Sequence, residues 1–470
     1  MAEVLPPPVE TFRAAAAEPS ARRELWGWCA IGVVALGLAG LFALLLALSR
    51  TPGVSEIVPW PLAFFRKALV VHVVFAFVVW FLAVFGAILH LAAWQVSDGR
   101  PRLAWLGGAG VILFAAGCVL IFIPALLDRG EPTLNNYVPA IIDPLYYLGL
   151  ALVAAGLTLP ILRLFVVRAA PGRRIDILSL AGVSAAIIFL VALICFGLAL
   201  DGLAGARIDD SFNEDLFWGG GHMLQFLTTT LLIGAWSVLA RQTVGADLAS
   251  RRVFVGSIAF LLVWVLPAPV FYFLFERFSA AHASAFSGLL WALGPPTLLI
   301  ALLGARTLRR QAGPLPWGDP VFLSLVLSAV VFGVGGILGM FIDGADTRTP
   351  AHYHGVIAGI MLAFFGLFFG LFLPLLGRAR VPRRAARFLA YAFCGGQTVA
   401  CLGLFLAGGY GAPRKVAGAA QGLDHIGALV GMTMNGIGAL VAVVGGVMFI
   451  WIAARALFGG APGHNQGEAV

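Results

Sequence analysis

Charged side chains are scarce in this 470-residue chain, since Asp, Glu, Lys and Arg together make up only 11% of it. A soluble domain carries about 25% charged residues, so the composition excludes a chain whose surface faces mainly water. The mean hydropathy is +0.97, and apolar runs of about 20 residues, long enough to cross a bilayer, recur along the sequence. The sequence therefore predicts an integral membrane protein embedded in a lipid bilayer.

Lysine is almost absent, because Lys67 and Lys415 are the only two, and the net charge of +8 comes almost wholly from arginine. In a soluble chain such an excess would suggest binding to nucleic acid. In a membrane chain it first indicates orientation, because arginine and lysine gather in cytoplasmic loops. We therefore expect no nucleic-acid partner.

Cysteine is also rare, and its placement excludes several kinds of site. None of the five cysteines forms a CxxC pair, and no CxxCH haem-attachment motif occurs. All five lie within apolar runs: Cys29, Cys118, Cys195, Cys394 and Cys401. Cysteine in such surroundings behaves as a small hydrophobic side chain, so we expect neither a covalently attached haem nor a metal bound by cysteine.

Hydropathy predicts an all-α fold of about twelve transmembrane helices. We expect residues 1–26 to form a cytoplasmic N-terminal tail, residues 27–457 the membrane domain and residues 458–470 a C-terminal tail. The predicted spans lie near residues 28–49, 64–94, 104–127, 143–167, 177–201, 216–240, 253–276, 284–306, 319–342, 351–377, 386–408 and 426–457.

Basic residues are distributed unequally between alternate loops. With the N-terminus inside, 21 of the 30 basic residues fall on the inner side, whereas the outer loops collect acids such as Asp209, Asp210 and Glu214. This bias has the sign expected when both termini are cytoplasmic, and an odd number of spans would destroy it. We expect a multi-pass protein of a bacterial cytoplasmic (inner) membrane.

Histidine is the most informative residue type, because only eight occur and five share one depth. On this topology His72, His222, His282, His352 and His354 all lie in the outer half of the membrane. A single histidine near a helix end can equally be an interfacial polar residue or a ligand. Polar side chains inside spans, however, usually face a cavity, a partner or a ligand. Five at one depth indicate a shared kind of ligand, and imidazole is a standard axial ligand of haem iron.

Two of these histidines lie two residues apart at the outer start of the tenth span, in Ala351-His352-Tyr353-His354. Residues i and i+2 of an α-helix point about 200° apart. The pair therefore cannot chelate one metal ion, but each member can ligate a separate haem on its own side of the helix.

This arrangement resembles subunit I of the haem-copper oxidase superfamily, which includes cytochrome c oxidases, quinol oxidases and nitric oxide reductases. The resemblance covers the chain from the first span to the twelfth, and it implies two haems, one low-spin and one high-spin. It implies that His72, in Leu69-Val70-Val71-His72-Val73, and His354 ligate the low-spin haem iron. His352 would ligate the high-spin haem iron, where the gas reacts.

The resemblance also implies roles for two further motifs. His222, in Gly219-Gly220-Gly221-His222-Met223, corresponds to the sixth-helix histidine that binds copper beside the high-spin haem. Arg414 and Lys415, which follow Pro413 in the loop before the last span, correspond to the basic pair that binds the haem propionates. An ordinary solvated loop is the alternative interpretation of this basic pair.

The chain departs from the family pattern at the copper site. Family members carry two adjacent histidines at the outer end of the seventh helix, whereas this chain offers only His282, close to the eighth span. A copper ion held by one or two imidazoles would be bound weakly.

Phe226 stands four residues after the sixth-helix histidine, where oxidases carry tyrosine and nitric oxide reductases glutamate. Tyr272 in the seventh span is a candidate substitute or a packing residue.

A further departure concerns protons. No Asp, Glu or Lys occurs in the inner half of any predicted span, so the family's usual acid and lysine routes for pumped protons are missing. Three hydroxyl side chains in the sixth span, Thr228, Thr229 and Thr230, offer a path of hydroxyls and water, or serve helix packing.

The resemblance implies the catalytic subunit of a respiratory terminal oxidase, an enzyme that reduces dioxygen with electrons from cytochrome c, quinol or a partner subunit. A nitric oxide reductase is the first alternative, because its reaction dispenses with the tyrosine. A copper-deficient haem protein of electron transfer is the second. A twelve-helix transporter is the third, but it would leave the histidine layer unexplained.

Overall fold

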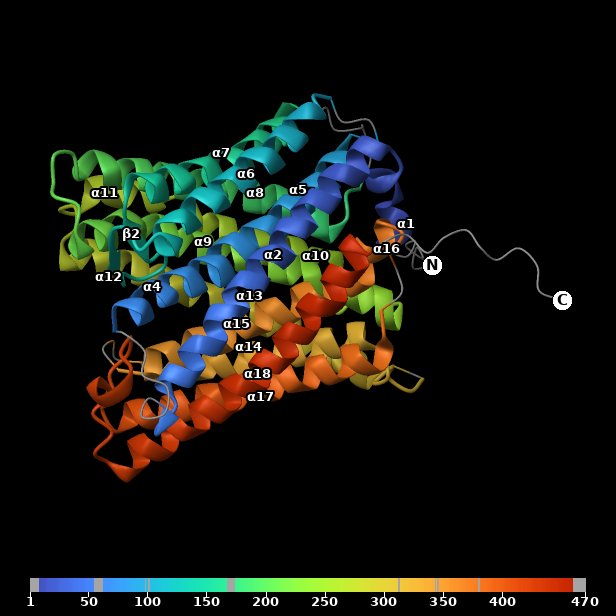
Figure 1. Cartoon of the computed structure of the whole chain (residues 1–470). Coiled ribbons are helices and arrows are strands. Elements are labelled where there is room, and N and C mark those ends of the chain that lie inside the picture. Colours follow the sequence, from blue (N-terminus) through green and yellow to red (C-terminus); the bar gives the residue numbers. More distant parts are fainter. Residues whose placement is uncertain are drawn as a thin grey trace.

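The computed structural model describes residues 8–54, 62–97, 99, 102–166, 174–311, 313–342, 344, 346–378 and 381–459. In this part of the chain twelve helices are long and apolar enough to cross a membrane, and they lie in one bundle (Figure 1). The predicted all-α fold with twelve spans is therefore confirmed. Most of the expected C-terminal tail lies outside the described residues.

The bundle is built from helices with one small hairpin. In chain order the elements are α1 (Pro8–Thr11), η1 (Arg13–Ala16), α2 (Pro19–Arg50), α4 (Leu62–Val73), η2 (Val74–Val79), α5 (Trp80–Val96), α6 (Trp105–Leu126), β1 (Glu131–Thr133), β2 (Ala140–Ile142), α7 (Pro144–Val166), α8 (Ile177–Gly202), α9 (Asp210–Val244), α10 (Arg251–Val265), η3 (Ala268–Val270), α11 (Phe271–Leu274), α12 (Ala280–Leu289), η4 (Leu290–Leu293), α13 (Gly294–Arg309), α14 (Pro320–Gly339), α15 (Arg348–Leu367), η5 (Phe368–Phe372), α16 (Leu373–Leu375), α17 (Arg383–Gly409), η6 (Gly418–Gln421) and α18 (Ile426–Phe458).

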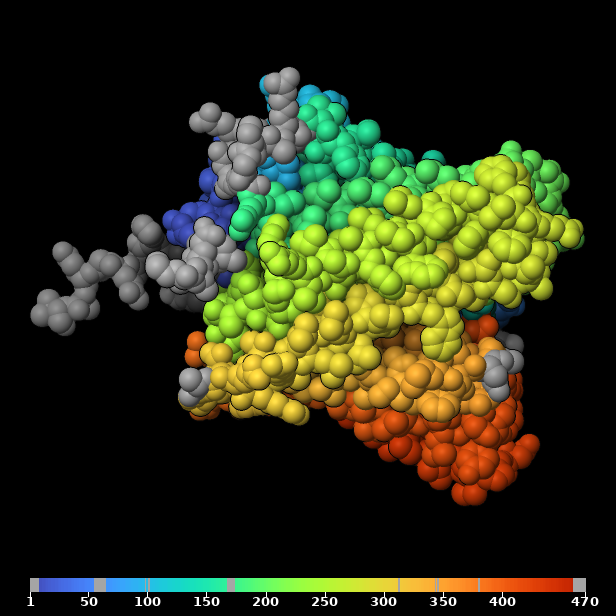
Figure 2. Space-filling model, turned by 180° about the vertical axis from the view of Figure 1, so that it is seen from behind, coloured from blue at the N-terminus to red at the C-terminus, as the bar shows by residue number. Residues whose placement is uncertain are grey.

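The two ends of the bundle differ in content. We call the end where α2 begins and α18 finishes the N/C end, and the opposite end the far end (Figure 1). Because successive spans alternate in direction, α4, α9, α15 and the β1–β2 hairpin all begin at or lie near the far end. The view from behind shows α10, α13 and α14, in yellow-green to gold, on the other face of the bundle (Figure 2).

Three spans form the centre of the bundle. The span that contains α9 is the most buried of the twelve, followed by the span from α15 to α16 and the span from α4 to α5. These central spans carry His222, the pair His352 and His354, and His72 respectively. Four of the five histidines of the layer therefore lie on central spans, where an imidazole can face a ligand instead of lipid.

Glycines let neighbouring spans touch through their backbones. A Cβ atom added at Gly117 of α6 would lie 2.6 Å from the carbonyl oxygen of Gly149 in α7, and one at Gly149 would lie 2.8 Å from that of Gly117. Gly403 of α17 and Gly431 of α18 meet in the same way. Such close contacts are how small residues join helices in a membrane.

The first span is longer than hydropathy indicates, because α2 starts at Pro19 and so includes Glu24. The Glu24 carboxylate accepts two hydrogen bonds of 2.7 Å from Arg163 of α7, and His90 Nδ1 lies 3.1 Å away. All three side chains are buried. The prediction that no acid lies in the inner half of a span is therefore wrong, because an arginine partner allows a carboxylate to be buried there.

Candidate functional site

His72 and His354 lie near each other at the far end of the bundle. His72 is near the end of α4, just before the π-helical turn η2, and its Nδ1 lies 3.0 Å from the carbonyl oxygen of Ala39 in α2. A carbonyl only accepts, so Nδ1 carries the proton and the lone pair is on Nε2. His354 of α15 lies close enough to His72 for the two imidazoles to interact electrostatically.

His352 leaves the same helix in another direction. Its Nδ1 lies 2.8 Å from the carbonyl oxygen of Gly335 in α14, and a Cβ atom added at Gly339 would lie 2.4 Å from this nitrogen. The imidazole is thus held between α15 and α14, again with the lone pair on Nε2. His352 and His354 contact different neighbours, as their i, i+2 spacing indicates.

Arg50, at the end of α2, is a residue of this region that the sequence analysis missed. Its Nε and one terminal nitrogen are buried without a hydrogen-bond partner among the described residues. The guanidinium interacts electrostatically with Tyr353 and His354. A buried cation without a partner is costly, so this position suits an anionic group. A haem propionate beside His354 would be such a group.

The loop that carries Arg414 and Lys415 is fixed against the start of α15. Thr347 donates its N–H to the Ala412 carbonyl at 3.0 Å and its hydroxyl to Leu404 at 2.7 Å. Burial, with Arg414 adding repulsion, lowers the pKa of Lys415 to about 8. Its ammonium donates to the carbonyl oxygen of Leu134 in the hairpin loop. The loop therefore holds two adjacent basic side chains near the start of α15.

The residues at the far end fit haem. Two imidazoles, those of His72 and His352, are oriented by backbone carbonyls in the way that metal-ligating histidines usually are, with Nε2 left for the metal. Arg50 supplies a cation in the same region, with two buried nitrogens that find no hydrogen-bond partner in the described part of the chain.

His222 differs from these histidines, because both of its ring nitrogens are engaged. Nδ1 lies 2.6 Å from the carbonyl oxygen of Trp218 and must donate to it. Nε2 lies 2.9 Å from the hydroxyl of Tyr137, which therefore donates to the Nε2 lone pair. An imidazole binds a metal through a lone pair, and His222 has none free. The side chain is fully buried.

His282 and Tyr272 form a separate contact. His282 is part of α12, not of a loop, and its ring centroid lies 4.7 Å from that of Tyr272 in α11. His282 Nε2 and the Tyr272 hydroxyl are buried and have no hydrogen-bond partner in the described ranges, and the hydroxyl abuts Gly219 of α9. Within the described residues, no three His, Cys, Asp or Glu side chains come together as a metal site. The family's three-imidazole copper site does not fit these residues.

Tyr137, the partner of His222, was also missed. It lies in the loop between β1 and β2, which pair antiparallel from Glu131–Ile142 to Thr133–Ala140. Its neighbour Asn136 donates from the backbone and the side chain to Glu214 of α9, at 2.7 and 2.6 Å. A Cβ atom at Gly221 would lie 2.5 Å from Tyr137. The pair Asn135-Asn136 marks a turn, but no local signal points to a helix 85 residues further on.

Comparisons with known proteins agree with this fold. The family model described as cytochrome c and quinol oxidase polypeptide I matches residues 25–448. An uncharacterised protein of Rickettsia prowazekii is 26% identical over 92% of this chain and 95% of its own length. An uncharacterised protein of Aquifex aeolicus is 29% identical over 77% of this chain and 88% of its own length.

A named relative and a solved structure extend the comparison. Cytochrome c oxidase subunit 1 of Thermus thermophilus is 25% identical over 52% of this chain and 48% of its own length. The cryo-EM structure of a haem-copper terminal oxidase dimer superposes with a TM-score of 0.78 at 14% identity, and the alignment covers 93% of this chain and 84% of that one. With a family match over most of its length, this chain belongs to the cytochrome c and quinol oxidase polypeptide I family, the subunit I family of the haem-copper oxidases.

Proposed function

We propose that this chain is the haem-binding catalytic subunit of a respiratory terminal oxidase that reduces dioxygen. The observation that carries the proposal is the placement of His72 and His354 in two of the three most buried spans, close enough to interact electrostatically. Arg50 lies near His354, and two of its nitrogens are buried without a hydrogen-bond partner among the described residues. Two bound haems would supply electron transfer and a binding place for the gas.

The chain's own residues would hold and orient these haems. His72 and His354 would ligate the low-spin iron, and His352 would ligate the high-spin iron. The Ala39 and Gly335 carbonyls keep the Nδ1 protons in place and so direct Nε2 toward each iron. Propionates would pair with Arg50, Arg414 and Lys415.

The direction of electron flow follows from the charge bias of the loops. We place the N/C end in the cytoplasm of a bacterial inner membrane, because the arginines gather there. Electrons would then reach the haems from the far end, delivered by a partner subunit, by cytochrome c or by quinol.

A nitric oxide reductase is the second candidate, and it is supported by two features. Phe226 offers no proton where an oxidase carries a tyrosine, and the three-imidazole copper site is incomplete. A copper-free haem protein that only transfers electrons would share both features. Membership of the oxidase family argues against a twelve-helix transporter.

Haem quantification with a histidine control tests the proposal. The purified chain should contain two haems in a pyridine haemochrome assay, and His354→Ala should remove the low-spin spectrum. His425→Ala is the matched control: His425 lies at the same end but caps α18 through Gly427 and stacks on Tyr410, 4.1 Å away. A wild-type chain without haem, or a His354→Ala variant with the full low-spin signal, would contradict the assignment.

A further inference from the structure

We infer that the hydrogen-bonded pair of Tyr137 and His222 replaces the family's copper ion in this chain. The inference deepens the proposed function, since it concerns the gas-binding side of the same site. It starts from the contact itself, in which the hairpin loop places a phenol hydroxyl 2.9 Å from Nε2 of a fully buried histidine.

The two hydrogen bonds of His222 leave it no free lone pair for a metal ion. The Trp218 carbonyl fixes the proton on Nδ1 at 2.6 Å, so Nε2 is the only nitrogen able to bind a metal ion. Tyr137 donates to that nitrogen. A copper ion would have to displace the hydroxyl, and within the described part of the chain no group of three His, Cys, Asp or Glu side chains could complete its coordination.

Tyr137 is held firmly enough to keep this position. Its backbone has φ +61°, an uncommon conformation for a residue with a side chain, which persists only when the surroundings impose it. Glu214 accepts two hydrogen bonds from the adjacent Asn136, and the Tyr137 ring packs edge-on against Trp218 at 5.6 Å. Tyr137 is therefore a positioning residue that fixes the orientation of His222.

Copper binding to matched tyrosine variants tests the inference. Wild-type protein, loaded with Cu(I) and dialysed against a chelator, should retain two haems and far less than one copper. Tyr137→Phe frees Nε2 of His222 and should raise copper affinity by up to about 10-fold, the scale of the one hydrogen bond that copper would no longer have to break. The added binding should vanish in Tyr137→Phe/His222→Ala. Tyr147→Phe, which removes a hydroxyl bonded to Asn213 at 3.0 Å, is the control.

The outcomes separate this inference from the proposed function. One tightly held copper per two haems in the wild type, lost in His222→Ala, would overturn the copper replacement and leave the haem function standing. A chain that binds no haem would instead overturn the proposed function. Equal copper binding by wild type and Tyr137→Phe would show that the hydroxyl does not block the nitrogen.

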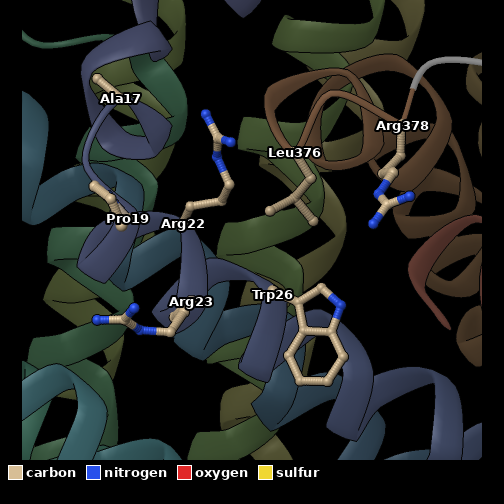
Figure 3. Close-up of a pocket in the computed structure, with 7 residues that line it drawn as sticks. All are labelled: Ala17, Pro19, Arg22, Arg23, Trp26, Leu376 and Arg378. Carbon is tan, nitrogen blue, oxygen red and sulfur yellow. The ribbon is translucent and has the colours of Figure 1, made fainter. Parts of the chain in front are cut away.

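A second, independent observation concerns the N/C end: we propose that a basic cavity there binds the phosphate group of an anionic phospholipid. The cavity has a volume of about 330 Å³ and lies between the start of α2 and the segment after α16 (Figure 3). Arg22, Arg23 and Arg378 line it together with Trp26 and Leu376.

The three arginines carry positive charge that the described residues do not neutralise. No described carboxylate forms an ion pair with any of them. Arg22 and Arg378 each donate one hydrogen bond to a backbone carbonyl, of Ala16 at 3.3 Å and of Gly459 at 3.0 Å. These contacts orient the guanidiniums and leave further N–H groups for a phosphate, which arginine binds in a forked geometry.

Trp26 and Leu376 add the apolar half that a lipid requires. The Trp26 indole N–H donates to the Leu457 carbonyl at 3.1 Å, while 39% of the residue remains exposed. Tryptophan in this position is typical of the membrane interface. Basic pockets between spans on the cytoplasmic side bind anionic headgroups. A free phosphate ion would use the arginines but not the indole.

Lipid retention by paired arginine variants tests this site. Delipidated full-length protein is mixed with vesicles of phosphatidylglycerol or phosphatidylcholine, and bound lipid is counted by native mass spectrometry. We expect phosphatidylglycerol alone to be retained, with at least a tenfold loss in Arg22→Gln/Arg378→Gln. Arg306→Gln/Arg309→Gln, at the exposed end of α13, should have no effect.

Three results would overturn the lipid site. Equal losses in both double variants would show a general effect of surface charge. Retention of phosphatidylcholine at the same level would show that the headgroup charge is not recognised. Displacement of the lipid by millimolar inorganic phosphate would show a site for free anions.

Discussion

The buried ion pair between Glu24 and Arg163 gives the sharpest prediction for stability. Replacing Arg163 by methionine removes two hydrogen bonds of 2.7 Å and leaves the Glu24 carboxylate buried, with only His90 Nδ1 at 3.1 Å. Removing one partner of a buried pair costs about 3–5 kcal/mol. We therefore expect Arg163→Met to lower the free energy of unfolding by an amount in that range.

A double-mutant cycle checks the reasoning in mixed micelles with increasing sodium dodecyl sulfate, followed by tryptophan fluorescence. Glu24→Gln/Arg163→Met should cost less than the sum of the single variants, because it leaves no unpaired charge. Arg13→Met is the control: its ion pair with Glu10 joins two side chains that are 75% and 49% exposed, and such pairs contribute about 0–1 kcal/mol. An Arg163→Met variant within about 1 kcal/mol of wild type would refute the argument.

Three further predictions concern the haems and the helix contacts. His352→Ala should abolish carbon monoxide binding while the low-spin spectrum persists; loss of both haem signals in a folded variant would contradict the separate roles. Arg50→Gln should lower the midpoint potential of the low-spin haem in a redox titration, because a positive charge near the iron is lost, and an unchanged potential would place Arg50 away from it. Gly117→Val should lower the free energy of unfolding by about 1–3 kcal/mol, since the new side chain overlaps the α7 backbone. Gly108 has open space beside it, so Gly108→Ala should have little effect in the same assay.

The spans were predictable because a transmembrane helix is a local feature of about 20 apolar residues. The histidine layer could also be found, since depth follows from distance to a span end, and His72, His352 and His354 lie in the central spans. Glu24 could not be placed in a helix by hydropathy, because its burial depends on Arg163, 139 residues away.

Tyr137 and Arg50 were missed for a related reason. The Tyr137 hydroxyl contacts His222, 85 residues later, and only the folded hairpin brings them together. Arg50 looks like an ordinary arginine at a helix end. Its importance appears only in the fold, where two of its nitrogens are buried and have no partner among the residues that the structure describes. Both residues are defined by their neighbours in space instead of by their neighbours in sequence.

The β1–β2 hairpin has a consequence for how this family diversifies. The group that contacts His222 comes from a connection between spans, and connections tolerate insertion and deletion far better than packed helices do. A change in the length of the segment between α6 and α7 could withdraw or supply the Tyr137 hydroxyl while the twelve spans stay in place. Among related chains, we expect the length of this connection to vary together with the histidines near the end of the seventh span.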